Sequence, residues 1–170
     1  MMELMNILGS SSAFLDKIFE NLALKEIDVT HLELDHICYR VATENEYLST
    51  KQNLLKFGKI LVASDVNGRE ITTFKLEHPI VYQSRIISIL ELPSPKQNSH
   101  YDSGFEHVEF VIKESLEDFQ LKYPSIDFDI KAMKKPFNRD LRISFGAISV
   151  KFHEQSLEKV IEIENNNSIL

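Results

Sequence analysis

The chain has 170 residues, and its 19 lysines and arginines against 26 aspartates and glutamates give a formal net charge of −7. This length suits one domain with a real core, and the five glycines and five prolines exclude collagen-like and low-complexity classes. A single cysteine, Cys38, excludes a disulfide scaffold and a thiolate-rich zinc finger. The acidic balance argues against nucleic-acid or membrane partners, since both require a basic surface.

The N-terminal residues contain no basic region and no long apolar run, so we expect neither a targeting segment nor a membrane span. The cytoplasm is therefore the default location, and a free Cys38 is normal there. We expect Cys38 to fill space in a pocket and not to act as a nucleophile.

Hydrophobic spacing predicts the first two elements of the chain. Apolar residues between positions 14 and 22 recur at helical spacing, and Ser11 or Ser12 is placed to cap that helix. The spacing changes to alternation over Leu34–Val41, which predicts a strand.

A second helix and three strands are expected next. Thr43 precedes Glu46 by three residues, the pattern of a capping box, and Gly58 is expected to end the helix. The strands are predicted at 59–65, 70–76 and 85–92, the first two joined by a hairpin turn at Asn67-Gly68.

The same order of elements then starts again. The second copy is predicted as a strand at Phe105–Ile112, a short helix capped by Ser115, strands at 126–133, 141–145 and 148–153, and a last helix at 156–163. The first-strand histidines, His36 and His107, are 71 positions apart (107 − 36), and the two helix caps are 72 apart (115 − 43). Such a repeat indicates units that bury a shared face against each other.

We therefore predict an α+β fold. Two tandem βαβββ modules would form a curved, mostly antiparallel, cup-shaped sheet with helices on its outer face, plus an N-terminal helix. The predicted single domain, residues 1–170, divides into an N-terminal helical segment (1–30), the first module (31–98), and the second module with the C-terminal helix (99–170).

Strand alternation places a set of polar side chains on the sheet face opposite the helices. The set consists of His36, Cys38, Arg40, Glu91, His107, Glu109, Ser149, Lys151 and His153. Asp35 and Glu106 are expected on the other face. Imidazole and carboxylate groups suit a divalent metal such as Zn, Fe, Mn or Ni. Three protein ligands would leave a catalytic site open, whereas four would close a structural one.

Each of these residues also has an ordinary structural interpretation. A lone histidine on a strand is more often a hydrogen-bonded pocket residue than a metal ligand, although the pairing of His36 with His107 strengthens the metal interpretation. Glu91 could end its strand in solvent. Arg40 and Lys151 could hold a substrate carboxylate or form surface ion pairs.

Three segments carry a family resemblance. Leu34–Arg40, Glu91–Lys96 and Gly104–Ile112 resemble the YecM-like family of the vicinal oxygen chelate superfamily, which includes glyoxalases, bleomycin-resistance proteins and extradiol dioxygenases. The resemblance extends from about residue 12 to 163. It implies paired βαβββ modules around a cavity, with a divalent metal held by residues on the first and last strand of each module.

Carried over residue by residue, the resemblance implies His36, Glu91 and His107 as metal ligands. The fourth ligand is usually a glutamate on the last strand, where this chain has Lys151, Phe152 and His153. Three alternatives stay open. His153 substitutes for the glutamate, water completes a site of three protein ligands, or the lysine occupies the position and prevents strong metal binding.

The resemblance further implies a Lewis-acid metal that chelates neighbouring oxygens of a substrate. The expected function is a divalent-metal enzyme of lyase, isomerase or dioxygenase type acting on a small oxygenated anion. Glu109 would support the metal site or act as a general base, and Arg40 and Lys151 would orient the anion. The alternative is a metal-independent protein that binds a small molecule in the same cavity. A monomer or a weak homodimer is expected, because one chain already carries both modules.

Overall fold

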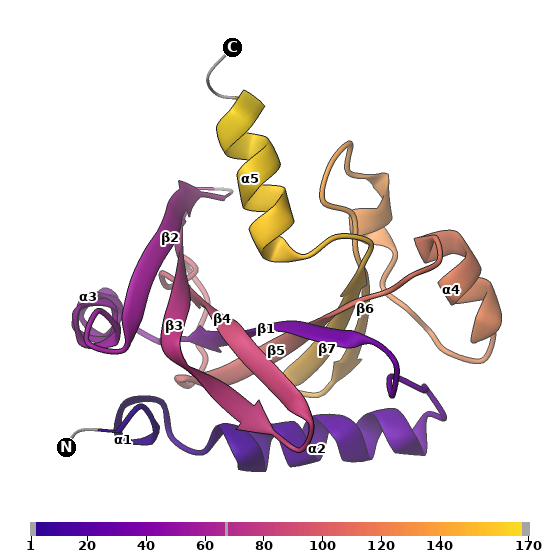
Figure 1. Cartoon of the computed structure of the whole chain (residues 1–170), viewed down its shortest axis with the longest axis horizontal. Helices are drawn as coiled ribbons and strands as arrows, with labels where there is room; N and C mark the ends of the chain where they lie inside the picture. The colour runs from indigo at the N-terminus through magenta and orange to yellow at the C-terminus, as the bar shows by residue number, and fades with distance from the viewer. Residues whose placement is uncertain (1–2, 67, 168–170) are drawn as a thin grey trace. The chain divides into compact units, whose positions relative to one another are not determined.

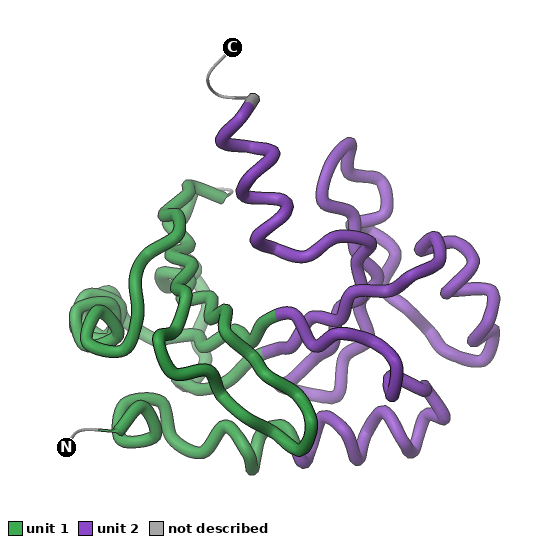
Figure 2. Tube along the Cα trace, in the orientation of Figure 1, with its two compact units in different colours: residues 1–15, 36–106 green, residues 16–35, 107–170 purple. Residues whose placement is uncertain are grey.

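The computed structural model describes residues 3–66 and 68–167 (Figure 1). Asn67, the first residue of the predicted hairpin turn, lies outside them. The chain divides into two compact units, which we call unit 1 (residues 1–15 and 36–106) and unit 2 (residues 16–35 and 107–170) (Figure 2). The predicted fold class is confirmed: α+β, with tandem modules and mostly antiparallel strand pairing. The extent of a single domain stays a prediction.

Unit 1 contains the first βαβββ module except for the first three residues of β1, which belong to unit 2. It comprises α1 (Met5–Leu8), the start of α2 (Ser11–Leu24), β1 (Glu33–Arg40) from His36 onward, α3 (Glu44–Leu54), β2 (Gly58–Asp65), β3 (Glu70–Tyr82), β4 (Arg85–Pro93) and the first residues of β5 (Gly104–Val111). The strand order is β2-β3-β4-β1, in which β1 runs parallel to β4 and the other pairs are antiparallel. The first strand of the module therefore lies beside its last.

Local signals explain how α3 begins and why β2 can pair. Thr43 accepts a hydrogen bond from the Glu46 backbone N–H and donates its own N–H to the Glu46 carboxylate, which confirms the capping box. The helix ends at Leu54, so the expectation that Gly58 ends it was wrong. Gly58 instead starts β2, where a Cβ atom would lie 2.2 Å from the Lys75 carbonyl oxygen. Only glycine permits this close approach of β2 to β3.

Unit 2 contains the second module. It comprises the remainder of α2, β5 from His107 onward, α4 (Leu116–Lys122), a 3₁₀ helix η1 (Lys131–Lys134), β6 (Leu141–Phe145), β7 (Ile148–His153) and α5 (Leu157–Asn167). β5 runs parallel to β7, and β6 is antiparallel to β7. Ser115 caps α4 as predicted, since its Oγ accepts the Asp118 backbone N–H.

The predicted strand at 126–133 was wrong. In that segment only Asp129 pairs with a strand, through one bridge to Arg142, and η1 follows. The Asp129 carboxylate accepts the backbone N–H of Lys131, a local hydrogen bond that turns the chain out of an extended path. Alternating apolar residues were therefore not sufficient for a strand here.

Each unit has an apolar core to which α2 contributes. In unit 1, Phe14 of α2 stacks on Phe105 at 5.3 Å between ring centroids. In unit 2, Phe19 of α2 meets Phe110 at 6.1 Å. The α2 cap is Ser10, whose Oγ accepts the Ala13 backbone N–H, and not Ser11 or Ser12 as expected. None of the helices in the described part of the chain is long and apolar enough to cross a membrane.

Candidate functional site

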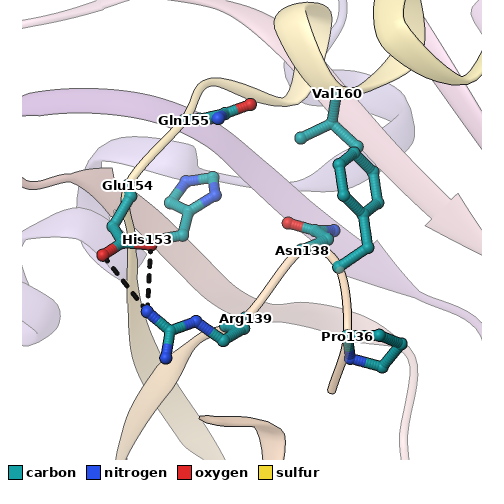
Figure 3. Close-up of a pocket in the computed structure, with 8 residues that line it drawn as sticks. Pro136, Asn138, Arg139, His153, Glu154, Gln155 and Val160 are labelled. Atoms are coloured by element: carbon teal, nitrogen blue, oxygen red, sulfur yellow. Dashed lines mark hydrogen bonds and ion pairs between the residues drawn. The ribbon is translucent and has the colours of Figure 1, made fainter. Parts of the chain in front are cut away.

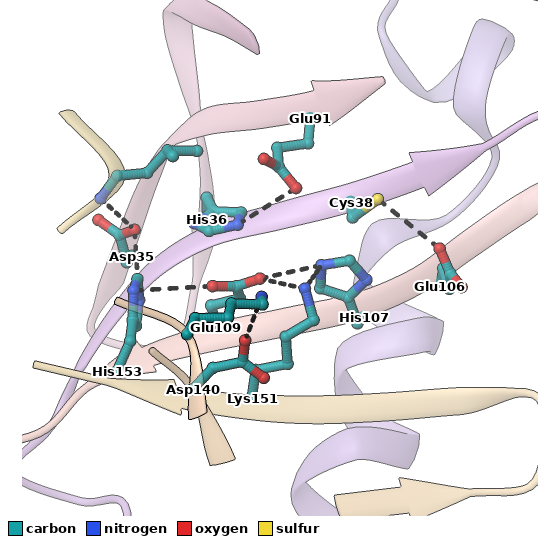
Figure 4. A network of polar contacts seen from close by, with 12 residues as sticks. Asp35, His36, Cys38, Glu91, Glu106, His107, Glu109, Asp140, Lys151 and His153 are labelled. Atoms are coloured by element: carbon teal, nitrogen blue, oxygen red, sulfur yellow. Dashed lines mark hydrogen bonds and ion pairs between the residues drawn. The ribbon is translucent and has the colours of Figure 1, made fainter. Parts of the chain in front are cut away.

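In unit 1, a buried histidine faces a carboxylate on the neighbouring strand. The parallel pairing of β1 with β4 sets Cys38 opposite Glu91, so Glu91 lies two residues along from His36. His36 Nε2 lies 3.5 Å from Glu91 Oε2, and the His36 side chain is 1% exposed (Figure 4). An imidazole nitrogen and a carboxylate oxygen at this separation are suitable ligands for one divalent metal.

Cys38 is buried on the same strand, and its thiol lies 3.9 Å from the Glu106 carboxylate. Sequence alternation had placed Glu106 on the opposite face, and that expectation was wrong. Phe105 packs edge-to-face on Tyr39, with 5.2 Å between ring centroids, and therefore takes the apolar side at this point. The contacts of Glu106 with Cys38 and Arg40 place its side chain on the side of those two residues.

Arg40 is held by the segment that leads into β5. Its Nε donates to the Asp102 carbonyl oxygen at 3.2 Å, and its Nη1 lies 3.7 Å from the Glu106 carboxylate. The guanidinium also stacks 4.7 Å above the centre of the Tyr101 ring. A substrate anion at Arg40 would share it with these three partners.

In unit 2, three polar groups make a tight triangle. Lys151 Nζ lies 2.6 Å from Glu109 Oε1 and 3.1 Å from His107 Nε2, and that nitrogen lies 3.2 Å from the same Glu109 oxygen (Figure 4). His107 and Glu109 are buried. The pairing of β5 with β7 sets Glu109 directly opposite Lys151, which fixes the triangle.

His153 is buried between two carboxylates of unit 2. Its Nε2 lies 3.7 Å from Asp35 Oδ2, and its Nδ1 lies 3.7 Å from Glu109 Oε2. Asp35 also accepts the Leu157 backbone N–H at 2.9 Å, at the start of α5. Asp35 therefore links the position of His153 to the beginning of a helix, a role that the sequence did not suggest.

A small cavity of about 150 Å³ opens beside His153 in unit 2 (Figure 3). Its other walls include Asn138, Gln155 and Val160. Arg139 forms ion pairs there with Glu117 and Glu154. The Arg139 guanidinium holds the pKa of the Glu117 carboxyl below its ordinary value. Sequence reasoning missed this cavity, because the path of an irregular loop has no periodic signal.

A second polar cluster, in unit 1, was also missed. The Glu70 carboxylate accepts hydrogen bonds from the Lys51 ammonium and the Tyr47 hydroxyl. The Thr72 hydroxyl shares a further hydrogen bond with the Tyr47 hydroxyl. The bonds from Lys51 and Tyr47 keep the pKa of Glu70 below its ordinary value. Burial raises the pKa of Tyr47. The four side chains come from α3 and β3, so this cluster joins a helix to the sheet.

Comparison with known proteins gives relatives that match this chain over nearly all of its length. A protein of Haemophilus influenzae described as uncharacterised is 28% identical over 186 residues, covering 96% of this chain and 97% of the relative. Protein YecM of Escherichia coli is 27% identical over 182 residues, covering 96% and 95%. The solved structure of a structural-genomics protein named EC4020 has a TM-score of 0.76 at 25% identity, covering 92% and 91%.

A more distant solved structure shares the fold alone. Methylmalonyl-CoA epimerase of Streptomyces coelicolor, in complex with 2-nitronate-propionyl-CoA, has a TM-score of 0.50 at 10% identity, covering 71% of this chain and 95% of that one. The family described as YecM protein matches residues 3–164. The chain therefore belongs to the YecM family, and it shares its fold with methylmalonyl-CoA epimerase.

Proposed function

We propose that this chain binds one divalent metal ion through His36, Glu91 and His107, and acts with it on a small oxygenated anion. The observation that carries the proposal is the His36–Glu91 pair, an imidazole with 1% exposure and a carboxylate 3.5 Å away on the adjacent strand. The family match covers all three residues. The epimerase structure holds a CoA ester, which also presents neighbouring oxygens, and the substrate class proposed here is a small oxygenated anion.

The donor set of unit 1 fits a divalent metal, because a neutral imidazole and a carboxylate are its usual ligands. In unit 2, His107 and Glu109 offer the same atom types, but Lys151 contacts both. A bound metal would supply Lewis-acid stabilisation of negative charge on substrate oxygens. We assign the reaction to the lyase, isomerase or dioxygenase type. We place the protein in the cytoplasm, where Cys38 would stay reduced.

The residues of the chain then have separate tasks. Glu109 would move a proton at its carboxylate, which Lys151 orients at 2.6 Å. Arg40 would bind the anionic group of the substrate, in competition with Glu106. His153 is the candidate for a fourth ligand, and its present neighbours are the carboxylates of Asp35 and Glu109.

Metal analysis of untagged protein, purified without chelator, tests the proposal. We expect one Zn, Fe, Mn or Ni ion per chain in the wild type. The double variant His36→Ala/His107→Ala should lose it, and Glu91→Gln should weaken binding in a titration with the same metals. The matched control is His78→Ala/His100→Ala, which removes two exposed histidines. Wild-type protein that takes up none of these metals would refute the proposal.

A metal-independent binding protein is the second candidate, and Lys151 is the observation that favours it. An ammonium group against His107 and Glu109 repels a metal cation and attracts an anion. A thermal-shift screen with small anionic and aromatic ligands separates the candidates. Stabilisation that persists in excess chelator supports metal-independent binding, whereas stabilisation that chelator abolishes supports the metal proposal.

A further inference from the structure

The pairing registers of the two modules identify equivalent positions. In unit 1, Cys38 of β1 lies opposite Glu91 of β4 in a parallel pair. In unit 2, Glu109 of β5 lies opposite Lys151 of β7, again in a parallel pair. Cys38 and Glu109 each follow the module's histidine by two residues. Lys151 therefore occupies in the second module the position that Glu91 occupies in the first, and His153 lies two residues beyond it.

The Lys151 ammonium contacts an atom of His107 and an atom of Glu109 that could together bind a metal. It donates to Glu109 Oε1 at 2.6 Å, and it lies 3.1 Å from His107 Nε2. His107 Nε2 and Glu109 Oε1 lie 3.2 Å apart, and each can offer a lone pair to one metal ion. Lysine has three N–H donors and no lone pair while it is charged, so it cannot itself serve as a ligand. A metal and the ammonium therefore compete for the same two atoms.

Charge explains why the ammonium belongs to this position. Glu109 is buried, and a buried carboxylate is costly unless a cation or hydrogen bonds compensate it. Lys151 supplies both forms of compensation. In unit 1 the equivalent of Glu109 is the uncharged Cys38, and the equivalent of Lys151 is Glu91, whose carboxylate lies beside His36.

We propose that Lys151 is a built-in cation that keeps the second module from supplying a full pair of metal ligands. This inference rests on the proposed function, and it selects one form of that function. The metal is held mainly by His36 and Glu91, its affinity is moderate, and coordination positions stay open for a substrate. Lys151 is in these terms a residue that sets metal affinity and not a metal ligand.

Isothermal titration of wild-type protein, Lys151→Gln and Lys151→Glu with Mn²⁺ and Zn²⁺ tests the inference. Lys151→Gln keeps hydrogen-bonding atoms and removes the charge, so we expect at least tenfold tighter binding. Lys151→Glu restores the carboxylate found at the equivalent Glu91, so it should bind more tightly still. Thermal unfolding with and without metal is the second readout, and Lys151→Glu should show the largest metal-dependent rise in Tm. Lys59→Gln, on an exposed lysine of β2, is the matched control.

The outcomes separate this inference from the proposed function. Unchanged affinity and Tm response in both Lys151 variants would overturn the inference, while metal binding by the wild type would leave the proposed function standing. Binding by Lys151→Glu alone would refute native metal binding, and it would overturn both the proposed function and the moderate-affinity site inferred here. If wild type and all variants bind neither metal, both are overturned.

Discussion

The two modules share a backbone frame and differ in the charges they place on it. In the first, the carboxylate is that of Glu91 on the last strand, beside His36. The residue opposite Glu91 on the first strand is the uncharged Cys38. In the second, the carboxylate of Glu109 is on the first strand, and Lys151 on the last strand neutralises it. The first module sets a carboxylate beside its histidine, whereas in the second a lysine contacts both the histidine and the carboxylate. Duplicated topology thus does not imply duplicated chemistry.

The cores differ as well, and this gives the largest expected change in stability. Phe152 and Leu92 hold equivalent places on the last strands, and both are fully buried. Phe152 also lies 4.5 Å from the ring of Phe119 and 6.0 Å from that of Phe110. Phe152→Ala should lower the free energy of unfolding by roughly 3–5 kcal/mol.

The matched change Leu92→Ala should cost less than Phe152→Ala, because no aromatic cluster is lost with it. Urea denaturation of the two variants and the wild type measures both values. A larger loss in Leu92→Ala would show that the first module, and not the aromatic core of the second, makes the greater contribution to stability.

The helix caps provide a smaller comparison between the modules. Thr43→Ala removes the hydroxyl half of a reciprocal capping box, and Ser115→Ala removes the equivalent cap of α4. Each should cost about 1 kcal/mol. We expect the larger loss for Thr43→Ala. The capping box holds the Glu46 carboxylate, which also accepts hydrogen bonds from the Ala42 backbone N–H and the Ser103 hydroxyl. Thermal denaturation measures the difference, and Thr43→Ser is the control that keeps the cap.

Acidification should change the free energy of unfolding less than the core substitutions and the cap substitutions do. The pKa of Glu70 is lower in the folded chain than its ordinary value of 4.5, mainly because Lys51 donates a hydrogen bond to it. Its contribution to stability is therefore complete above pH 4.5 and is lost as the pH falls through the lowered value. Since Glu70 is partly exposed, the loss should stay below about 1 kcal/mol.

The variant Glu70→Gln tests this acid effect. Its unfolding free energy should fall less between pH 6 and pH 3 than that of the wild type. Salt at ~1 M should reduce this difference between the two proteins, because it screens the Glu70–Lys51 pair. An identical pH dependence in the two proteins would show that the Glu70–Lys51 pair contributes nothing.

Much of the fold was predictable because its signals are local. The capping box at Thr43, the cap at Ser115 and the alternation around His36 and His107 each depend on residues within a few positions of one another. The strand predicted at 126–133 failed for a local reason too, because the Asp129 side chain turns the backbone. The resemblance of short segments to the YecM family was confirmed by a match over residues 3–164.

The sequence by itself determined the repeat and most of the element order, but the strand predicted at 126–133 and the face predicted for Glu106 were wrong. It could not decide between Lys151 and His153 as the counterpart of Glu91, because both have the same alternation and differ by one full period of the strand. Only the tertiary structure decided this, through the pairing that sets Glu109 opposite Lys151. Strand register is a property of backbone hydrogen bonds between segments distant in sequence, so it has no signature within either strand alone.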